Sequence, residues 1–217
     1  SQSGVAFQKY SREFIVAAKM GGGDPAANFR LRTAIEKAKA GGLPNDNIKR
    51  AIEKGCGAGA SENYEELTYE GYGAGGVAVI VEAMTDNRNR TAGDIRSYFT
   101  KFNGNLGETG CVGWMFKDAG VVTFAKDDVD YEQLFNEAIN AGADDFVDED
   151  DEYKVITAPE NFQIVVESLE KLGFKHSGAE LTKLPQNTLE ITDENDDVQN
   201  VYSNFDIPDE VMEKVQI

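Results

Sequence analysis

Short amphipathic stretches separated by glycines make up the first 55 residues of the chain. Apolar residues recur at helical spacing in residues 5–20, 25–40 and 44–55, and glycines follow each stretch. An Asp-Pro pair opens the second stretch and a Pro-Asn pair opens the third, and these residues suit the start of a helix. Because the loops between the three helices are short, the pattern predicts a compact three-helix bundle.

A linker rich in Gly, Ala and Ser at residues 56–63 precedes a different pattern, in which strands alternate with single helices. Alternating residues predict a strand at 65–72, and a Val/Ile-rich run predicts a buried strand at 76–84. Further strands are expected at residues 112–116, 120–125, 153–158 and 179–184. Helices are expected at residues 91–102, 131–141 and 159–172. This alternation predicts α+β units of ferredoxin-like size after the bundle.

Composition narrows the class of protein. Of the 217 residues, 41% are hydrophobic and 10% are aromatic, which is enough to form real cores. No apolar run approaches the roughly 20 residues of a membrane span, and the chain opens without an apolar signal segment. Two distant cysteines fit a reducing compartment, and the single histidine, His176, argues against metal sites built on several imidazoles. We therefore expect a cytoplasmic protein without membrane contact, metal or other cofactor.

Charge divides the chain into a basic head and an acidic body. Residues 1–60 hold ten Lys and Arg against five Asp and Glu, a net charge of +5. Residues 61–217 hold eleven against 34, a net charge of −23. A basic cluster attracts polyanions and an acidic body limits adhesion elsewhere, so the split indicates a head that docks on a polyanion. Ordinary variation of a solvated surface is the alternative, and charge alone leaves it open.

The candidate phosphate contacts lie on the second and third predicted helices and in one loop. On the second helix, two pairs of cations are seven positions apart, so each pair lies along one helix face. Three more cations cluster on the third helix, and two arginines occupy the loop at residues 85–91. The predicted nucleic-acid-binding residues are Arg30, Arg32, Lys37, Lys39, Lys49, Arg50, Lys54, Arg88 and Arg90. The structural alternatives are solvated helix faces and, in the loop, helix caps made by Asp86 and Thr91.

Other motifs give weaker signals. Gly71, Gly73 and Gly76 fit G-x-G-x-x-G but open a strand instead of a helix, so we interpret them as a turn between two strands. The acidic run at residues 144–152 lacks the glycine and the closing glutamate of an EF-hand, and we expect a solvated loop. No set of nucleophile and base emerges around His176. We therefore predict that the protein is not an enzyme.

Five long segments resemble the YebC/PmpR family, the group that includes the mitochondrial translational activator of cytochrome c oxidase. They are LRTAIEKAKA (31–40), LPNDNIKRAIEKG (43–55), YEGYGAGGVAVIVEAMTDNRNRT (69–91), GNLGETGCVGWMF (104–116) and DDVQNVYSNFDIP (196–208). These segments are ordered and spread over almost the whole chain, so the resemblance is highly specific.

The resemblance implies an α+β fold of three domains, in which an N-terminal three-helix bundle precedes two ferredoxin-like α+β domains, the last inserted in the middle one. The bundle is expected at residues 1–60, the middle domain at 61–125 plus 186–217, and the acidic insert at 126–185. Two segments depart from the family pattern. Members usually begin with a basic stretch resembling AGHSKWANIKHRK, which does not precede Ser1. They also usually have a helix where only residues 193–195 stand here, and we interpret this gap as omitted residues, because losing a packed helix would expose apolar surface.

The resemblance also implies a non-enzymatic, nucleic-acid-binding regulator of gene expression. Bacterial members are usually described as DNA-binding transcriptional regulators, and members are also implicated in translation of proline runs at the ribosome. Duplex DNA would require base contacts from the third helix, whereas RNA is often read by exposed aromatic residues. Tyr69, Tyr72 and Trp114 are predicted strand residues, which are more often buried. Duplex DNA and ribosomal RNA therefore both stand as partners, with no small-molecule substrate, and an acidic adaptor for a basic protein is a third hypothesis.

Overall fold

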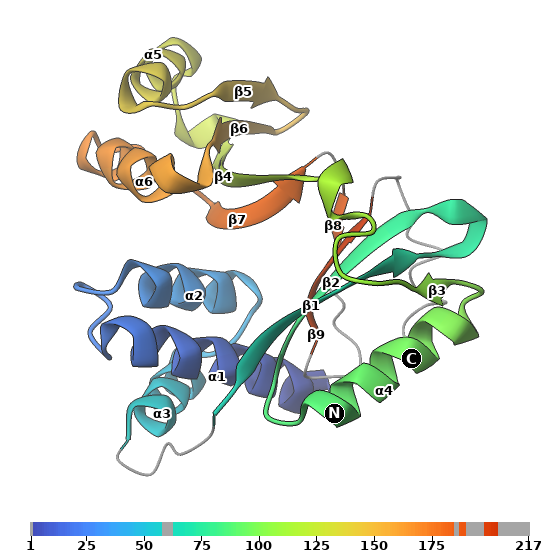
Figure 1. Ribbon diagram of the computed structural model, residues 1–217. Coiled ribbons are helices and arrows are strands. Elements are labelled where there is room, and N and C mark those ends of the chain that lie inside the picture. The colour runs from blue at the N-terminus through green and yellow to red at the C-terminus, as the bar shows by residue number, and fades with distance from the viewer. Residues whose placement is uncertain (1, 58–62, 185–186, 190–197, 204–217) are drawn as a thin grey trace. The chain divides into compact units, whose positions relative to one another are not determined.

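The computed structural model describes residues 2–57, 63–184, 187–189 and 198–203 of the chain. It is a mixed α+β structure, with an N-terminal helical region followed by two sheets, as predicted (Figure 1). The chain divides into two compact units. Unit 1 comprises Ser1–Ala34, Leu43–Lys117 and Pro185–Ile217, and unit 2 comprises Ile35–Gly42 and Asp118–Leu184. The three-domain division with boundaries at 60, 125 and 185 stays a prediction.

Three helices open the chain: α1 (Gln2–Gly21), α2 (Phe29–Ala40) and α3 (Asn45–Cys56). The second begins later than predicted, because the side chain of Asp24 accepts the N–H of Ala26 in a turn and does not start the helix. Asn28 does that instead, since its buried side-chain oxygen accepts the N–H of Leu31 at 3.1 Å.

The sheet of unit 1 contains five strands in the order β3-β1-β2-β9-β8, and the pairings are antiparallel. Its strands are β1 (Glu65–Tyr72), β2 (Ala78–Thr85), β3 (Asn105–Leu106), β8 (Asn187–Leu189) and β9 (Val198–Ser203). Helix α4 (Arg88–Lys101) packs on one face, where Ile95 and Phe99 meet Val81 of β2. On the opposite face, Ile80 of β2 meets Val112. The Val/Ile-rich strand is therefore buried on both faces, which explains the apolar run from Val77 to Val81.

Two parts of unit 1 differ from the sequence prediction. The expected strand at residues 112–116 is wrong, because Gly113–Met115 forms a 3₁₀ turn. Strands β3, β8 and β9 were not predicted, since β3 and β8 have only two and three residues and leave almost no periodicity to detect. The glycines at 71–76 do form a turn between β1 and β2, as interpreted. The segment at residues 193–195, where a family helix was expected, lies outside the described residues.

Unit 2 contains a four-stranded sheet in the order β5-β6-β4-β7, with the chain order βαββαβ. Its elements are β4 (Lys117–Ala125), α5 (Tyr131–Ala141), β5 (Asp145–Asp148), β6 (Glu152–Thr157), α6 (Phe162–Lys171) and β7 (Gly178–Leu184). This topology is the split βαβ arrangement of ferredoxin-like domains, as predicted. The acidic run at 144–152 is not a loop throughout, because it contains β5, which pairs with β6 in a hairpin.

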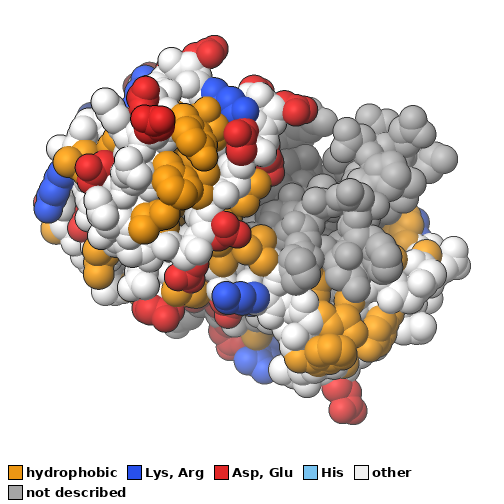
Figure 2. Space-filling model, turned by 90° about the horizontal axis from the view of Figure 1, so that it is seen from above, with side chains coloured by type: hydrophobic (Ala, Val, Ile, Leu, Met, Phe, Trp, Pro, Cys, Tyr) orange, Lys and Arg blue, Asp and Glu red, His pale blue; other side chains and the backbone are white. Residues whose placement is uncertain are grey.

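The surface of unit 2 combines acidic and aromatic side chains. Tyr131, Phe135, Phe146 and Tyr153 form a cluster whose ring centroids lie 5.4–5.9 Å apart. Figure 2 looks onto the side of this unit where α5 and β5 lie, and shows hydrophobic side chains gathered there with Asp and Glu around them. Within the described part of the chain, none of the helices has the length and apolar character needed to cross a membrane.

Candidate nucleic-acid interface

Helix α3 packs against α1 through one face. Ile48, Ala51 and Gly55 are buried at intervals of three and four residues. The packing at Gly55 is tight, since a Cβ added there would lie 2.8 Å from Cγ1 of Ile15 on α1. The opposite face is exposed and carries three cations, Lys49, Arg50 and Lys54, which we call the α3 cations.

The α3 cations have no carboxylate partner among the residues that the structure describes. Their side chains are exposed, and within that part of the chain none of them makes an ion pair or a hydrogen bond. Glu53 lies among them on the same helix, yet no ion pair joins it to Lys49 or Arg50. Three positive charges on two helical turns are therefore available to an anion.

The two arginines at the start of α2 are engaged within unit 1. Arg30 donates from Nε to Glu13 at 2.8 Å and from Nη2 to Glu66 at 2.7 Å. Burial opposes the charge of Arg30, but the hydrogen bonds and charges of Glu13 and Glu66 outweigh burial and raise its pKa. The guanidinium of Arg32 lies 5.2 Å from the centroid of the Phe29 ring. Arg30 therefore has a structural role that its position in the sequence did not reveal.

Lys37 and Lys39 lie in the second half of α2, which belongs to unit 2. Lys37 Nζ is 3.6 Å from the carboxylate of Glu180 on β7. Lys39 is exposed and has no ion pair within the described ranges. The nine predicted residues are thus divided between two units, and among the described residues only the α3 cations form a cluster without ion pairs.

The arginines at the junction of β2 and α4 are paired with acids. Arg88 donates from Nη2 to Glu65 at 2.8 Å, and Arg90 donates from Nη2 to Asp86 at 2.9 Å. The hydrogen bond from Arg90 lowers the pKa of Asp86. The helix cap is neither Asp86 nor Thr91 as considered, because Asn87 accepts the N–H of Arg90 at 3.0 Å.

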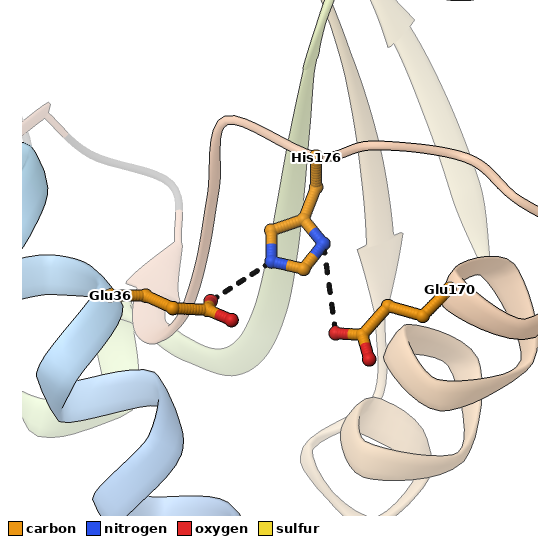
Figure 3. Close-up of side chains that lie close together, drawn as sticks. All are labelled: Glu36, Glu170 and His176. Atoms are coloured by element: carbon orange, nitrogen blue, oxygen red, sulfur yellow. Dashed lines mark hydrogen bonds and ion pairs between the residues drawn. The ribbon is translucent and has the colours of Figure 1, made fainter.

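His176 lies between two carboxylates in unit 2 (Figure 3). Its Nε2 is 2.9 Å from Glu36 on α2, and its Nδ1 is 3.8 Å from Glu170 on α6. One ligand atom of each residue lies within 4.8 Å of the others, which is compatible with a metal ion by distance alone. The carboxylates face opposite nitrogens of the ring, however, so one ion on the imidazole would face only one of them. The geometry therefore favours separate contacts of the two ring nitrogens with the two carboxylates over chelation of one ion.

Sequence reasoning missed a feature of unit 1 that involves a buried glutamate, Glu70. We call it the Glu70 loop and define it as residues 107–115. Glu70 on β1 is 6% exposed, and its carboxylate accepts the backbone N–H groups of Gly110, Val112 and Gly113. Its backbone carbonyl also accepts the N–H of Gly107 at 2.8 Å. Glu70 is separated from these partners by about 40 positions, so only the glycine density of the loop signalled it.

The Glu70 loop places Trp114 on the surface. Trp114 is 75% exposed and lies in a 3₁₀ turn instead of the strand predicted at residues 112–116, whereas the sequence alone leaves its exposure open. Tyr69 and Tyr72, by contrast, are partly buried against the two faces of the sheet.

Family models match nearly the whole chain. The TACO1/YebC N-terminal domain matches residues 1–58, and the second and third domains of TACO1/YebC match residues 64–205. This chain belongs to the TACO1/YebC family. The resemblance predicted from the sequence is thereby confirmed.

Relatives in the TACO1/YebC family cover nearly the full length. A probable transcriptional regulatory protein of Geobacter sulfurreducens is 54% identical over 229 aligned positions, which cover 99% of this chain and 92% of the relative. One from Thermoanaerobacter pseudethanolicus is 51% identical, with coverages of 97% and 92%. The crystal structure of a conserved hypothetical protein from Aquifex aeolicus matches with a TM-score of 0.78 and 44% identity, over 96% of this chain and 92% of that one. The structural match and the family-model matches therefore cover the same, nearly complete, length of the chain.

Proposed function

We propose that this protein is a nucleic-acid-binding regulator of gene expression that performs no chemistry of its own, and that it acts as a DNA-binding transcriptional regulator. The observation that carries the proposal is the exposed cluster of α3 cations, which have no ion-pair partner among the residues that the structure describes. The names of the relatives, probable transcriptional regulatory proteins, support the same class.

Electrostatics explains how α3 would select a nucleic acid. Phosphates attract the α3 cations at any sequence, and binding releases condensed counterions, so affinity falls steeply with salt. Elsewhere the chain is strongly acidic, with −23 over residues 61–217, and this charge repels a polyanion. A local basic face on an acidic protein thus favours phosphate contact at α3 over contact with the acidic surface. Phosphate contacts of this kind position a protein, and they carry no sequence information by themselves.

The test is charge reversal on α3. Lys49→Glu/Arg50→Glu should weaken binding to labelled duplex DNA and lower the log–log salt slope by about 1.8, since each phosphate contact contributes about 0.9. The matched control is Lys171→Glu/Lys175→Glu, which makes the same charge change at exposed positions of unit 2. An equal effect of both variants would mean that net charge, and not the α3 face, governs binding.

The second candidate function is a translation factor that binds ribosomal RNA. The exposure of Trp114 favours it, because aromatic side chains stack on the unpaired bases of RNA. Ultraviolet crosslinking in growing cells, with RNA and DNA recovered from one purification, separates the two. Crosslinks concentrated in ribosomal RNA would replace the transcriptional proposal, whereas crosslinks at discrete DNA sites would support it.

The acidic-adaptor hypothesis receives less support. Two acids of the β5–β6 hairpin already pair with lysines of unit 2: Asp148 with Lys126 at 2.5 Å, and Glu149 with Lys154 at 3.1 Å. These pairs reduce the charge that the hairpin would offer to a basic partner.

A further inference from the structure

Trp114 is the only tryptophan of the chain and is 75% exposed, although its neighbours pack on the sheet. Val112 is fully buried against β2 and β9, and Met115 and Phe116 pack against the same cluster. An isolated exposed apolar residue is common on protein surfaces and needs no explanation by itself. The structure that supports Trp114 is what distinguishes it.

A buried carboxylate fixes the backbone beneath Trp114. Both carboxylate oxygens of Glu70 accept hydrogen bonds from backbone N–H groups of the Glu70 loop. Two of the donors, Gly110 and Gly113, lie on either side of Val112 in the sequence. A carboxylate that is this buried is costly unless it is hydrogen-bonded, so the loop and Glu70 stabilise one another. The fit leaves no room for change at Gly113, where a Cβ would lie 2.7 Å from Oε1 of Glu70. Gly110, at φ +91°, has a backbone conformation that other residues rarely adopt.

The indole is also held in orientation. Its Nε1 donates to the carbonyl of Cys111 at 3.1 Å. Because this is the only hydrogen-bond donor of a tryptophan side chain, Trp114 has none left for a ligand, and it offers its aromatic faces. A rigid aromatic ring binds a flat partner with little loss of conformational entropy.

The surroundings of Trp114 suit a planar polar ligand better than an apolar protein surface. Among the described residues of unit 1, the only other large hydrophobic side chain counted as strongly exposed is Met20, on α1. Residues 107–110 of the loop are Gly, Glu, Thr and Gly. The apolar neighbours Val112, Met115 and Phe116 pack into the core, so the loop itself presents no second strongly exposed apolar side chain of the kind that surrounds an anchor residue in protein interfaces. Lys117 is exposed three positions later and supplies a positive charge for a neighbouring phosphate.

We propose that Trp114, presented by the Glu70 loop, is a stacking platform for an unpaired base of single-stranded nucleic acid. This inference rests on the proposed function, because it assigns a second contact to the same class of ligand. It adds that the ligand is at least locally single-stranded, since a paired and stacked base does not offer its face to a protein side chain.

The experiment uses the intrinsic fluorescence of the full chain, whose tryptophan emission comes from Trp114 alone. Twelve-nucleotide single strands of RNA and of DNA, and the matched duplex, are titrated at low salt while a labelled copy reports binding by anisotropy. We expect quenching by the single strands and little by the duplex. Trp114→Ala should weaken single-strand binding about 5- to 150-fold, the range for loss of one base stack, and Trp114→Phe should retain most of the affinity. Preference for RNA over DNA of one sequence would assign the platform to RNA, and equal quenching would assign it to either single strand.

The control variant separates the two proposals. Lys49→Glu/Arg50→Glu should weaken binding yet give the same quenching at saturation, because it leaves Trp114 in place. Binding without quenching, together with unchanged affinity of Trp114→Ala, would overturn the stacking inference and leave the proposed function standing. Equal quenching by duplex and single strands would also overturn it. Absence of binding to every oligonucleotide would instead overturn the proposed function itself.

Discussion

Helix α3 and the Glu70 loop are two exposed parts of unit 1 that are built in opposite ways. The α3 cations are long, flexible side chains with no protein partner among the described residues. The Glu70 loop instead holds a single rigid ring, with the backbone fixed by a buried carboxylate and the indole N–H already satisfied. The first surface attracts charge at long range, and the second acts only on contact.

This difference indicates two separate ways in which a weakly basic head on an acidic protein could recognise a nucleic acid. Phosphate contacts are salt-dependent and do not depend on the bases. Stacking on an aromatic ring depends little on salt and requires an accessible base. The two surfaces therefore predict separable effects, and the following variants test whether they are as different as their construction indicates.

The largest effect should come from removing the support of the Glu70 loop. Glu70→Ala leaves three backbone N–H groups without their acceptor and a cavity beside Val112, so we expect a loss of about 3 kcal/mol in the stability of unit 1. For a chain of this size that corresponds to a fall of roughly 6–12 °C in Tm, measured by circular dichroism.

Glu66→Ala is the matched control for Glu70→Ala. Glu66 lies on the same strand, but its side chain is 53% exposed and makes a surface ion pair with Arg30. Such a pair contributes about 0–1 kcal/mol. If both variants melt alike, the carboxylate of Glu70 does not organise the loop.

A smaller effect is expected from glycine substitutions beside the loop. A Cβ at Gly104 would lie 2.3 Å from the carbonyl oxygen of Tyr72, so Gly104→Ala should cost about 1–3 kcal/mol through displaced backbone. Gly93 lies on α4 with open space around it, and Gly93→Ala should stabilise the protein by about 0.4–1 kcal/mol. Chemical denaturation measures both. Equal signs for the two variants would contradict the close packing of β1 on the segment before β3.

The α3 cations and Trp114 should also differ in how their contributions to affinity depend on salt. The variant Lys49→Glu/Arg50→Glu lacks two phosphate contacts, so its affinity falls less steeply with salt than that of the wild type. The ratio of wild-type to variant affinity should therefore shrink roughly tenfold between 0.1 and 0.4 M salt. The affinity lost in Trp114→Ala should stay nearly constant over the same range. Anisotropy titrations at four salt concentrations measure both losses. Parallel decay of the two would mean that Trp114 acts through the charges around it.

The sequence predicted α3 well and the Glu70 loop poorly, for a physical reason. Helical spacing is local, so the buried face of α3 and the exposed position of Lys49 follow from neighbours three and four residues away. The environment of Trp114 depends on Glu70, which is 44 positions earlier, and no local pattern encodes that contact. The same limit applies to the cations, because Arg30 meets Glu13 and Glu66 only in the folded chain. Clustering of charge thus found the candidates but could not separate paired from unpaired ones.

The smallest expected effect concerns a cation that, unlike the α3 cations, is paired. Asp86→Asn removes the carboxylate that pairs with Arg90, and we expect a fall of at most about 2 °C in Tm at pH 7, because the pair is exposed. The hydrogen bond from Arg90 lowers the pKa of Asp86 from its ordinary value of 3.8. A carboxyl group whose pKa is lower in the folded state stabilises the fold above the unfolded pKa, and this contribution is lost as pH falls through the folded pKa.

The Tm difference between wild type and Asp86→Asn should therefore be present at neutral pH and disappear in acid, below about pH 3.8. Binding gives an independent readout, since Asp86→Asn removes the ion pair of Arg90 without adding a cation, while the hydrogen bond from Arg90 to Thr85 stays in place. A slight gain in affinity for nucleic acid would show that the ion pair withholds Arg90 from phosphate. A loss of affinity would mean that Asp86 positions Arg90 for binding, and the distinction drawn between paired and unpaired cations would fail at this junction.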